Sequence, residues 1–160
     1  MRVIRAIHDL AVALLAGGIA GGSLSAIVLF RKAPTREVAG EVGQAIFDLL
    51  GIVVLSLSIV LLASRILLQR EETPSWKRST ALALSVICAA AACVIALWLT
   101  PAMGAIWESG PHAADGSGLA GDARASFMRL HGMANLSYLI LLLSSAGMIL
   151  LRPGPGSVPK

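Results

Sequence analysis

The sequence predicts an all-α integral membrane protein, a bundle of four transmembrane helices, from three observations. Only 14% of its 160 residues are charged, whereas soluble domains carry about 25% charged residues. The uncharged residues gather into four long runs, and the mean hydropathy is +0.80. Basic residues stand at the ends of these runs, where lipid headgroups and loops lie. One transmembrane domain over residues 1–152 is therefore expected, without a second domain.

The first span is expected at about 10–30, a run of 21 residues without a charge, which is the length that a membrane-spanning helix needs. The run exceeds the apolar core of a signal peptide, about 7–15 residues, so a retained helix is predicted. Two overlapping GxxxG-type pairs lie inside it: Gly17, Gly18, Gly21 and Gly22. Glycines at this spacing let a neighbouring backbone approach closely in lipid. We interpret them as a packing seam, within the bundle or between protomers of a homo-oligomer.

The second span is expected at about 42–64 and is interrupted only by Asp48. Ahead of it, Thr35 is predicted to cap a short helix. A carboxylate at membrane depth costs on the order of 2.5–3.5 kcal/mol at a helix centre and less near an interface. Gln44 lies four residues before Asp48, on the same helix face. The pair is therefore expected to point into the bundle or into a hydrated mouth.

The third span is expected at about 79–107, which is uncharged for 29 residues. Pro101 is predicted to kink it near the far interface, because proline lacks a backbone N–H. Cys88 and Cys93 lie inside this span, five positions apart, which turns them about 140° from each other on a helix. Neither a disulfide nor a metal pair is indicated, and both cysteines are interpreted as apolar packing residues.

A flexible extracytoplasmic loop is predicted at 108–125, followed by the fourth span at about 127–151 and a disordered tail at 153–160. Four spans place both termini on one side of the membrane. On that side, the N-terminus, the turn at 69–78 and the tail carry seven Lys and Arg residues, against five on the other side, which favours cytoplasmic termini. The expected location is a bacterial inner membrane.

A candidate polar or ligand site is expected at the extracytoplasmic mouth, where the ends of three spans meet. Its members lie within about two turns of one interface: His131, Asp48, Met103, Asn135, Gln44 and Arg129. Asp48 beside His131 could form an ion pair, a proton relay or half of a metal site completed by Met103 or water. In the alternative interpretation, the two residues only satisfy each other or backbone carbonyls, or do not meet.

The other histidine at a helix end cannot join this site. His8 lies at the cytoplasmic start of the first span, which places it about 30 Å from His131 at 1.5 Å per residue. The two histidines therefore cannot ligate one haem or one metal within a protomer. Near His8, the side chains of Arg5 and Asp9 are expected to combine headgroup contacts with helix capping.

Short matches to a known family run along nearly the whole chain: His8, residues 17–18 and 21–22, Phe30, residues 36–40, Phe47, residues 101–103 and residues 127–132. On these residues the chain resembles the transmembrane protein 205-like family, small four-span membrane proteins with a domain of unknown function. The resemblance implies a four-helix membrane bundle and little about chemistry. A looser similarity to copper-resistance membrane proteins implies a link to soft metals.

The function expected from the sequence is that of a structural or accessory membrane component. The sequence has no Ser/His/Asp order, paired carboxylates, HExxH or glycine-rich phosphate loop, so no enzyme is predicted. No cofactor is expected, and a soft or borderline metal ion at His131 and Asp48 is left open. The expected partners are the lipid bilayer and either another membrane protein or a second copy, not nucleic acid. The alternative is a metal-handling or proton-coupled transporter with its polar site at the extracytoplasmic mouth.

Overall fold

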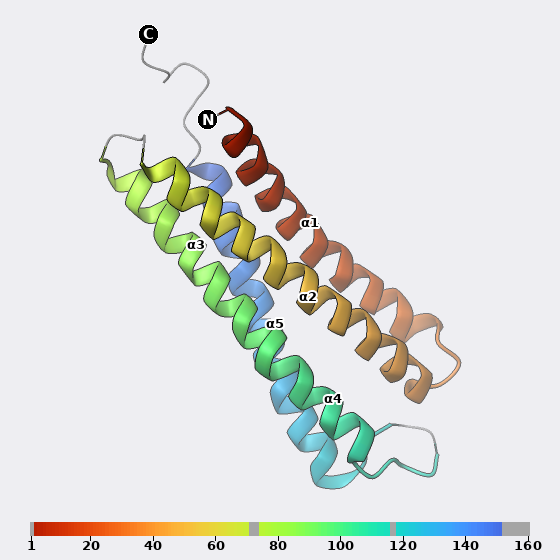
Figure 1. The fold of residues 1–160 in the computed structure, drawn as a ribbon. Helices are drawn as coiled ribbons and strands as arrows, with labels where there is room; N and C mark the ends of the chain where they lie inside the picture. The colour runs from red at the N-terminus through yellow and green to blue at the C-terminus, as the bar shows by residue number, and fades with distance from the viewer. Residues whose placement is uncertain (1, 71–73, 116–117, 152–160) are drawn as a thin grey trace.

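The chain forms a bundle of long helices that run alternately up and down, as the computed structural model in Figure 1 shows. The structure describes residues 2–70, 74–115 and 118–151. Within them, four helices are long and apolar enough to cross a membrane, which confirms the predicted all-α membrane bundle. The elements are α1 (Arg2–Lys32), α2 (Arg36–Gln69), α3 (Trp76–Val94), the π-helical segment η1 (Ile95–Leu99), α4 (Thr100–Ser109) and α5 (Gly121–Leu150).

The four long helices close into a ring. α1 packs against α2 and α5, and the continuous helix made of α3, η1 and α4 packs against the same two neighbours. α1 begins and α5 ends at one end of the bundle, which we call the termini end (Figure 1). The opposite end, the loop end, carries the α1–α2 connection and the segment 110–120 that joins α4 to α5.

The helices are longer than the predicted spans. α1 begins at Arg2 instead of about residue 10, and α2 begins at Arg36 instead of about residue 42. The predicted spans followed uncharged residues, whereas a helix continues into the headgroup region wherever residues of good helix propensity follow. The cap predicted at Thr35 is confirmed, because its side-chain oxygen accepts a hydrogen bond from the backbone N–H of Val38 at 3.2 Å.

The segment 108–125, predicted to be a flexible loop, is helical at both ends. α4 extends to Ser109 and α5 begins at Gly121. Between them, Leu119 is buried, and the backbone N–H of Ala113 donates to the carbonyl oxygen of Gly118 at 2.8 Å. The connection is therefore shorter than predicted and packs on the bundle through Leu119. The tail predicted to be disordered, 153–160, lies outside the described residues.

Pro101 distorts the third long helix without ending it. Because Pro101 has no N–H, the carbonyl of Leu97 loses its donor four residues ahead. The chain widens into the π-helical segment just before the proline, and the N–H of Thr100 donates to the carbonyl of Ile95, five residues back. The predicted kink at Pro101 is thus a wider turn that precedes the proline.

The core runs along the bundle axis and is made of aliphatic and small residues, with Leu15, Leu61 and Leu141 fully buried. The buried serines Ser85 and Ser145 donate to carbonyls of their own helices at 2.9 and 2.8 Å, so their hydroxyls are satisfied without water. Cys88 lies in this core and Cys93 is exposed. The packing role predicted for the cysteines therefore holds for Cys88 alone, because the two side chains point to different sides of one helix.

The glycines of α1 do not form a packing seam inside the protomer. Apart from its chain neighbours and the nearby backbone of α1 itself, a Cβ added at Gly17, Gly18 or Gly21 would meet no heavy atom within 4 Å. Of the four, only Gly22 has a neighbour, because a Cβ there would lie 2.8 Å from a methyl carbon of Leu50 in α2. Three of the four glycines therefore leave an open strip on α1, and their packing role within the bundle is corrected to Gly22 alone.

Among the glycines that the structure describes, Gly40 in α2 has the tightest neighbour, because a Cβ there would overlap the indole ring of Trp107. We therefore expect Gly40→Ala to lower the free energy of unfolding by about 1–3 kcal/mol, as overpacking does. The matched variant Gly17→Ala adds the same methyl group in open space and is expected to leave stability unchanged or slightly raised. Thermal unfolding followed by circular dichroism in detergent measures both. Equal effects of the two variants would contradict the packing described here.

Candidate functional site

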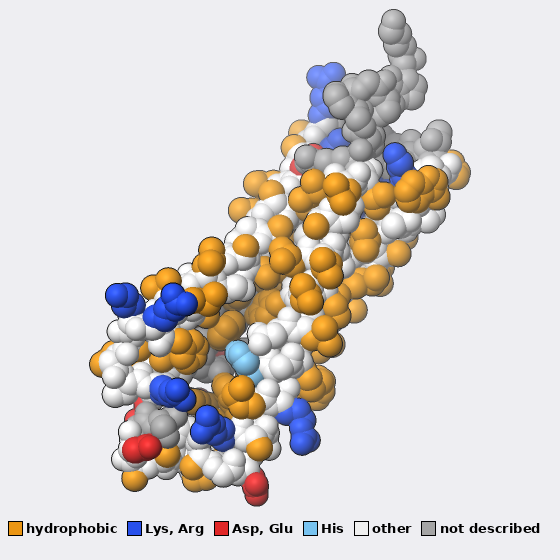
Figure 2. Space-filling model, turned by 180° about the vertical axis from the view of Figure 1, so that it is seen from behind, with side chains coloured by type: hydrophobic (Ala, Val, Ile, Leu, Met, Phe, Trp, Pro, Cys, Tyr) orange, Lys and Arg blue, Asp and Glu red, His pale blue; other side chains and the backbone are white. Residues whose placement is uncertain are grey.

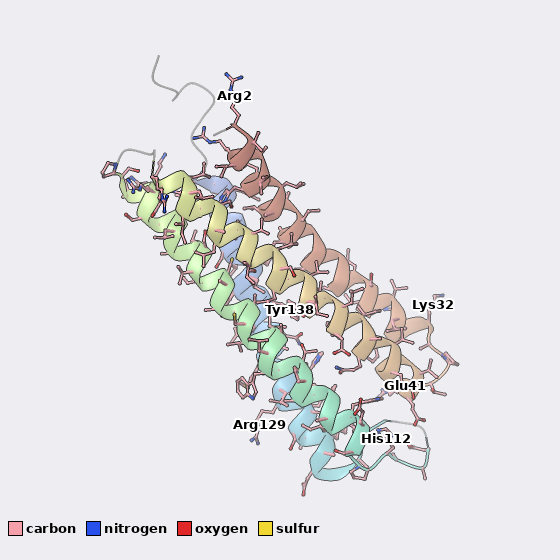
Figure 3. All side chains as sticks on the ribbon, in the orientation of Figure 1. Arg2, Lys32, Glu41, His112, Arg129 and Tyr138 are labelled. Carbon is pink, nitrogen blue, oxygen red and sulfur yellow. The ribbon has the colours of Figure 1, made fainter. Side chains whose placement is uncertain are left out.

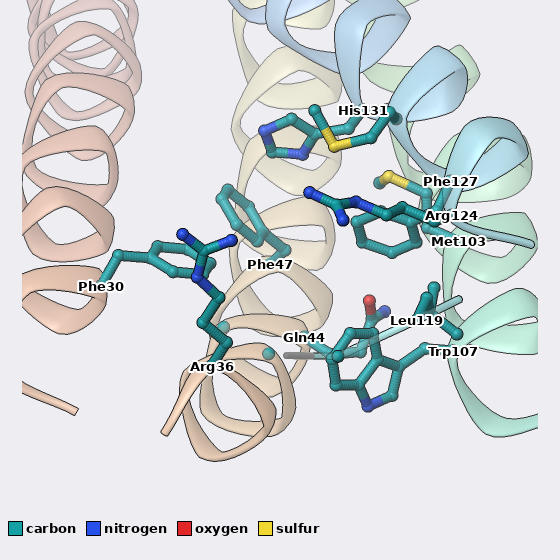
Figure 4. Close-up of a pocket in the computed structure, with 14 residues that line it drawn as sticks. Phe30, Arg36, Gln44, Phe47, Met103, Trp107, Leu119, Arg124, Phe127 and His131 are labelled. Carbon is teal, nitrogen blue, oxygen red and sulfur yellow. The ribbon is translucent and has the colours of Figure 1, made fainter. Parts of the chain in front are cut away.

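A cavity of about 300 Å³ opens at the loop end, between α2, α4, α5 and the connection 110–120. Apolar and aromatic side chains make up most of its wall, with a few polar groups among them (Figure 4). The side chains in the wall come from Phe30, Arg36, Gln44, Phe47, Met103, Trp107, Leu119, Arg124, Phe127, Met128 and His131. We call this space the loop-end cavity.

Helix periodicity explains how α2 and α5 line one space. On α2, Arg36, Gly40 and Phe47 follow one another at intervals of four and seven, so they share a face. On α5, Arg124 and His131 are seven residues apart and likewise share a face. The two faces meet across the cavity, with a cation at the loop-end side of each and an aromatic or imidazole ring deeper in the bundle.

His131 is held by aromatic rings. Its imidazole stacks on Phe127 of the same helix, with ring centroids 6.2 Å apart and planes at 11°. Phe47 of α2 meets the imidazole edge to face, with centroids 6.3 Å apart. Phe127 and His131 are four residues apart, which brings the two rings together on a helix. The half-buried imidazole therefore has a fixed orientation beside the cavity.

Two arginines bring positive charge into the cavity. Figure 4 shows the guanidinium groups of Arg36, from α2, and Arg124, from α5, both directed into it. Among the described residues, neither has a carboxylate within 4.0 Å. The nearby Glu37 instead lies 3.6 Å from the imidazole of His112 in the connection 110–120. The loop-end cavity is thus apolar in its walls and cationic in its polar content.

A longer groove of about 640 Å³ runs from the cavity along the seam between α1 and α5. Phe30, Phe47 and His131 line both spaces, so the groove and the cavity adjoin each other. Figure 2 shows the surface hollowed beside a histidine, with Lys and Arg side chains gathered around the loop end. We call this hollow the α1/α5 groove. It faces the side of the bundle that lipid would cover.

The residues predicted as one polar site fall into three groups. His131, Met103 and Gln44 line the loop-end cavity. Asn135 lines the α1/α5 groove instead. Arg129 lines neither space and points away from the bundle (Figure 3).

Asp48 is not brought to His131. It is exposed, and its Oδ1 accepts a hydrogen bond from Nε2 of Gln44 at 2.8 Å. Gln44 in turn lies against Gly104 of α4, whose added Cβ would be 3.3 Å from that nitrogen. The predicted Gln44–Asp48 pair is confirmed, but Asp48 lies outside the wall of the cavity and does not point into the bundle. The rotation of α2 about its axis, which the sequence leaves open, decides this.

His131 and Asp48 do not form the predicted metal site, because His131 lines the cavity and Asp48 lies outside its wall. Across residues 2–70, 74–115 and 118–151, no three His, Cys, Asp or Glu side chains come close enough to hold a metal ion. Met103 and Met128 share the cavity with His131, so the sulfur atoms of this wall are two thioethers. A soft-metal site there would use these thioethers and the imidazole, without a carboxylate.

At the termini end, Arg65 is the residue that the sequence analysis missed. It is 6% exposed, and its guanidinium donates to the backbone carbonyl of Arg78 at 3.2 Å. Its neighbour Ser64 is 3.1 Å from Nδ1 of His8. Arg65 follows an apolar run at the spacing of the buried residues Leu61 and Leu68, which is the signal that could have found it.

His8 and His131 lie at opposite ends of the bundle, as predicted. Their contacts on α2, Ser64 for His8 and Phe47 for His131, are 17 residues apart, about 26 Å along a helix. The two imidazoles therefore cannot share a ligand within one protomer.

The residues that most define the loop-end cavity were also absent from the predicted site. Trp107, whose ring centroid is 5.9 Å from that of Phe127, forms part of its wall, and Arg36 and Arg124 supply its charge. These arginines were interpreted as membrane-flanking charges. The regular spacing of residues 36, 40, 43, 44 and 47 on one face of α2 was the available signal.

We expect Arg65→Ala to lower the free energy of unfolding by about 1.5–3 kcal/mol, because a hydrogen bond from a charged group is lost and a buried side chain is removed. The matched variant Arg129→Ala removes an exposed arginine and is expected to stay within about 0.5 kcal/mol of the wild type. Thermal unfolding in the same detergent compares the two. If Arg129→Ala lowered the stability as much as Arg65→Ala, the effect would come from the removal of a charge and not from the burial of Arg65.

A family model described as "Domain of unknown function (DUF4149)" matches residues 10–112. No curated protein matches the chain, and no solved structure matches it. The narrower resemblance to the transmembrane protein 205-like family stays a prediction from the sequence. Because the match covers more than half of the chain, this integral membrane protein belongs to the DUF4149 family.

Proposed function

We propose that this protein is a structural or accessory membrane component that acts by binding, with the loop-end cavity as its binding site. The observation that carries the proposal is the wall of the cavity, where aromatic rings surround a space into which two guanidinium groups point. Apolar walls with a few placed polar groups are typical of binding pockets. No enzyme activity and no resident cofactor are proposed.

The surroundings of His131 support binding over catalysis. A histidine that acts as a general base is characteristically oriented by a group that hydrogen-bonds its imidazole. The rings that contact His131 are those of Phe47 and Phe127, which neither accept nor relay a proton. Its role in this proposal is to shape the wall between the cavity and the α1/α5 groove.

The alternative is a metal-handling or proton-coupled transporter, favoured by one observation. Met103, Met128 and His131 line the same cavity, and thioethers with imidazole suit a soft ion such as Cu(I). Against this stand Arg36 and Arg124, whose positive charges are directed into the same space and would repel a cation there. Asp48, the carboxylate that could offset them, lies outside the cavity wall. We therefore rank this alternative second.

The two functions differ in what the purified protein holds and moves. We expect wild type and His131→Gln, purified after growth with copper, zinc and iron, to contain no stoichiometric metal. Vesicles containing the wild type are expected to take up metal ions and protons no faster than empty vesicles. Elemental analysis and vesicle uptake are the measurements. Metal near one per protomer that is lost in His131→Gln, or uptake above the empty vesicles, would overturn the proposal in favour of transport.

The unfolding temperatures of His131→Gln and Asp48→Asn provide a second test of the proposed function. Under the proposed function, His131→Gln lowers the unfolding temperature because two ring contacts are lost. Asp48→Asn leaves it nearly unchanged, because an amide oxygen can still accept the Gln44 hydrogen bond.

We further infer a bacterial inner-membrane location with both termini in the cytoplasm, supported by the excess of Lys and Arg on the termini side. Ala114→Cys, in the connection 110–120 and in a background without Cys88 and Cys93, is expected to react with a membrane-impermeant maleimide added outside intact cells or spheroplasts. Labelling only after the membrane is permeabilised would reverse the orientation. A second copy or another membrane protein as partner remains part of this proposal.

A further inference from the structure

We propose that the loop-end cavity and the α1/α5 groove together bind one anionic phospholipid from the adjoining leaflet. Its phosphate lies between Arg36 and Arg124, and one acyl chain lies in the groove. The inference deepens the proposed function and rests on it, because it names the ligand class of the same site.

The charge of the cavity selects an anion. Arg36 and Arg124 are directed into a space walled by rings (Figure 4), and in the described part of the chain neither has a carboxylate within 4.0 Å. Arg31 lies at the rim of the groove, where the groove reaches the loop end. A guanidinium group can bind a phosphate through two parallel hydrogen bonds to its oxygens. Three arginines at one apolar opening therefore fit an anionic headgroup.

The length of the groove fits one leaflet. Along α1 it is lined from Ile19 to Arg31, and these twelve steps of 1.5 Å correspond to about 18 Å of helix. Half of a typical hydrocarbon core is about 15 Å. The groove thus begins at a cation at headgroup level and ends near the middle of the membrane, which matches the extent of one acyl chain.

The wall of the groove changes from polar to apolar along the same direction. His131 and Asn135 lie nearer the loop end, and Leu139 and Leu142 lie deeper. Between them is Tyr138, 8% exposed, whose buried hydroxyl has no hydrogen-bond partner among the described residues. The polar part of the wall therefore lies on the headgroup side of the groove, and the apolar part lies where an acyl chain would reach.

A soluble anion fits less of the site. Inorganic phosphate or glycerol 3-phosphate could pair with Arg36 and Arg124 but would leave the groove and the ring-lined wall without a partner. A neutral phospholipid could fill the groove and also carries a phosphate, but the positive charge of its headgroup would be repelled by the arginines, so it would gain less from them. An anionic phospholipid is the ligand class that uses both features.

The test measures lipid binding to the full chain in mild detergent by native mass spectrometry. Phosphatidylglycerol and phosphatidylcholine with identical acyl chains are titrated in parallel. We expect phosphatidylglycerol to bind at least about tenfold more tightly, which is about 1.4 kcal/mol. Arg36→Gln with Arg124→Gln is expected to reduce this preference to less than about twofold. Arg129→Gln, on the same helix as Arg124 but pointing away from the bundle, is expected to preserve it.

A second pair of variants tests the groove. Ala26→Leu places a larger side chain in its wall, whereas Ala20→Leu makes the same change at an exposed position outside that wall. Ala26→Leu is expected to weaken binding of both lipids several-fold, and Ala20→Leu is expected to have no effect. If the double arginine variant fails to fold, the wild type in about 1 M salt replaces it, because screening weakens the charge preference without a mutation.

Three results would overturn the inference. Equal binding of both lipids to the wild type would indicate non-selective lipid at the surface. If the double variant, or the wild type in high salt, still preferred phosphatidylglycerol to the same extent, the arginines would not be part of the lipid site. Full displacement of phosphatidylglycerol by millimolar glycerol 3-phosphate would indicate a soluble anion. The proposed function fails separately, through metal content or vesicle uptake, whatever the lipid result.

Discussion

The arrangement of the loop end depends on the packing of Trp107 against Gly40. The indole occupies the place that a side chain on α2 would take, and its other neighbours are the rings of Phe127 and His112, at centroid distances of 5.9 and 5.1 Å. One side chain therefore joins α4 to α2, α5 and the connection 110–120. Trp107 also lines the loop-end cavity, so the side chain that joins these elements forms part of the cavity wall.

The distribution of charge follows from which helix faces this packing turns inward. Arg36 shares the face of Gly40, so fixing Gly40 under the indole also directs Arg36 toward the cavity. On α2, the side chain of Gln44 lies against Gly104 of α4 and donates a hydrogen bond to Asp48, whose carboxylate is exposed. The site is thus cationic, although the span that supplies α2 contains a carboxylate near the same level. The sign of the charge inside the cavity separates an anion-binding role from a cation-handling one.

The sequence was sufficient for the bundle because hydrocarbon admits only helices and closed β-barrels, and uncharged runs of about 20 residues or more fit a helix and not a strand. Long uncharged runs then predict the number and order of helices, and the turn residue Thr35 predicts a cap that the structure contains. The site was harder to predict, because it depends on how each helix is rotated about its axis. A polar residue such as His131 signals a face but not its neighbours, which are aromatic rings instead of Asp48. The glycines of α1 show the same limit, since Gly22 meets α2 and Gly17 meets open space.

The family match and the site do not cover the same part of the chain. Residues 10–112 contain the α1 wall of the groove and the α2 and α4 walls of the cavity. Arg124, Phe127 and His131 lie on α5, beyond the matched residues. The matched part therefore carries Arg36, one of the two cations of the cavity, and the Gly40–Trp107 contact. The second cation and the imidazole come from α5, so the pair of positive charges proposed to select an anionic headgroup depends on the part of the chain outside the match.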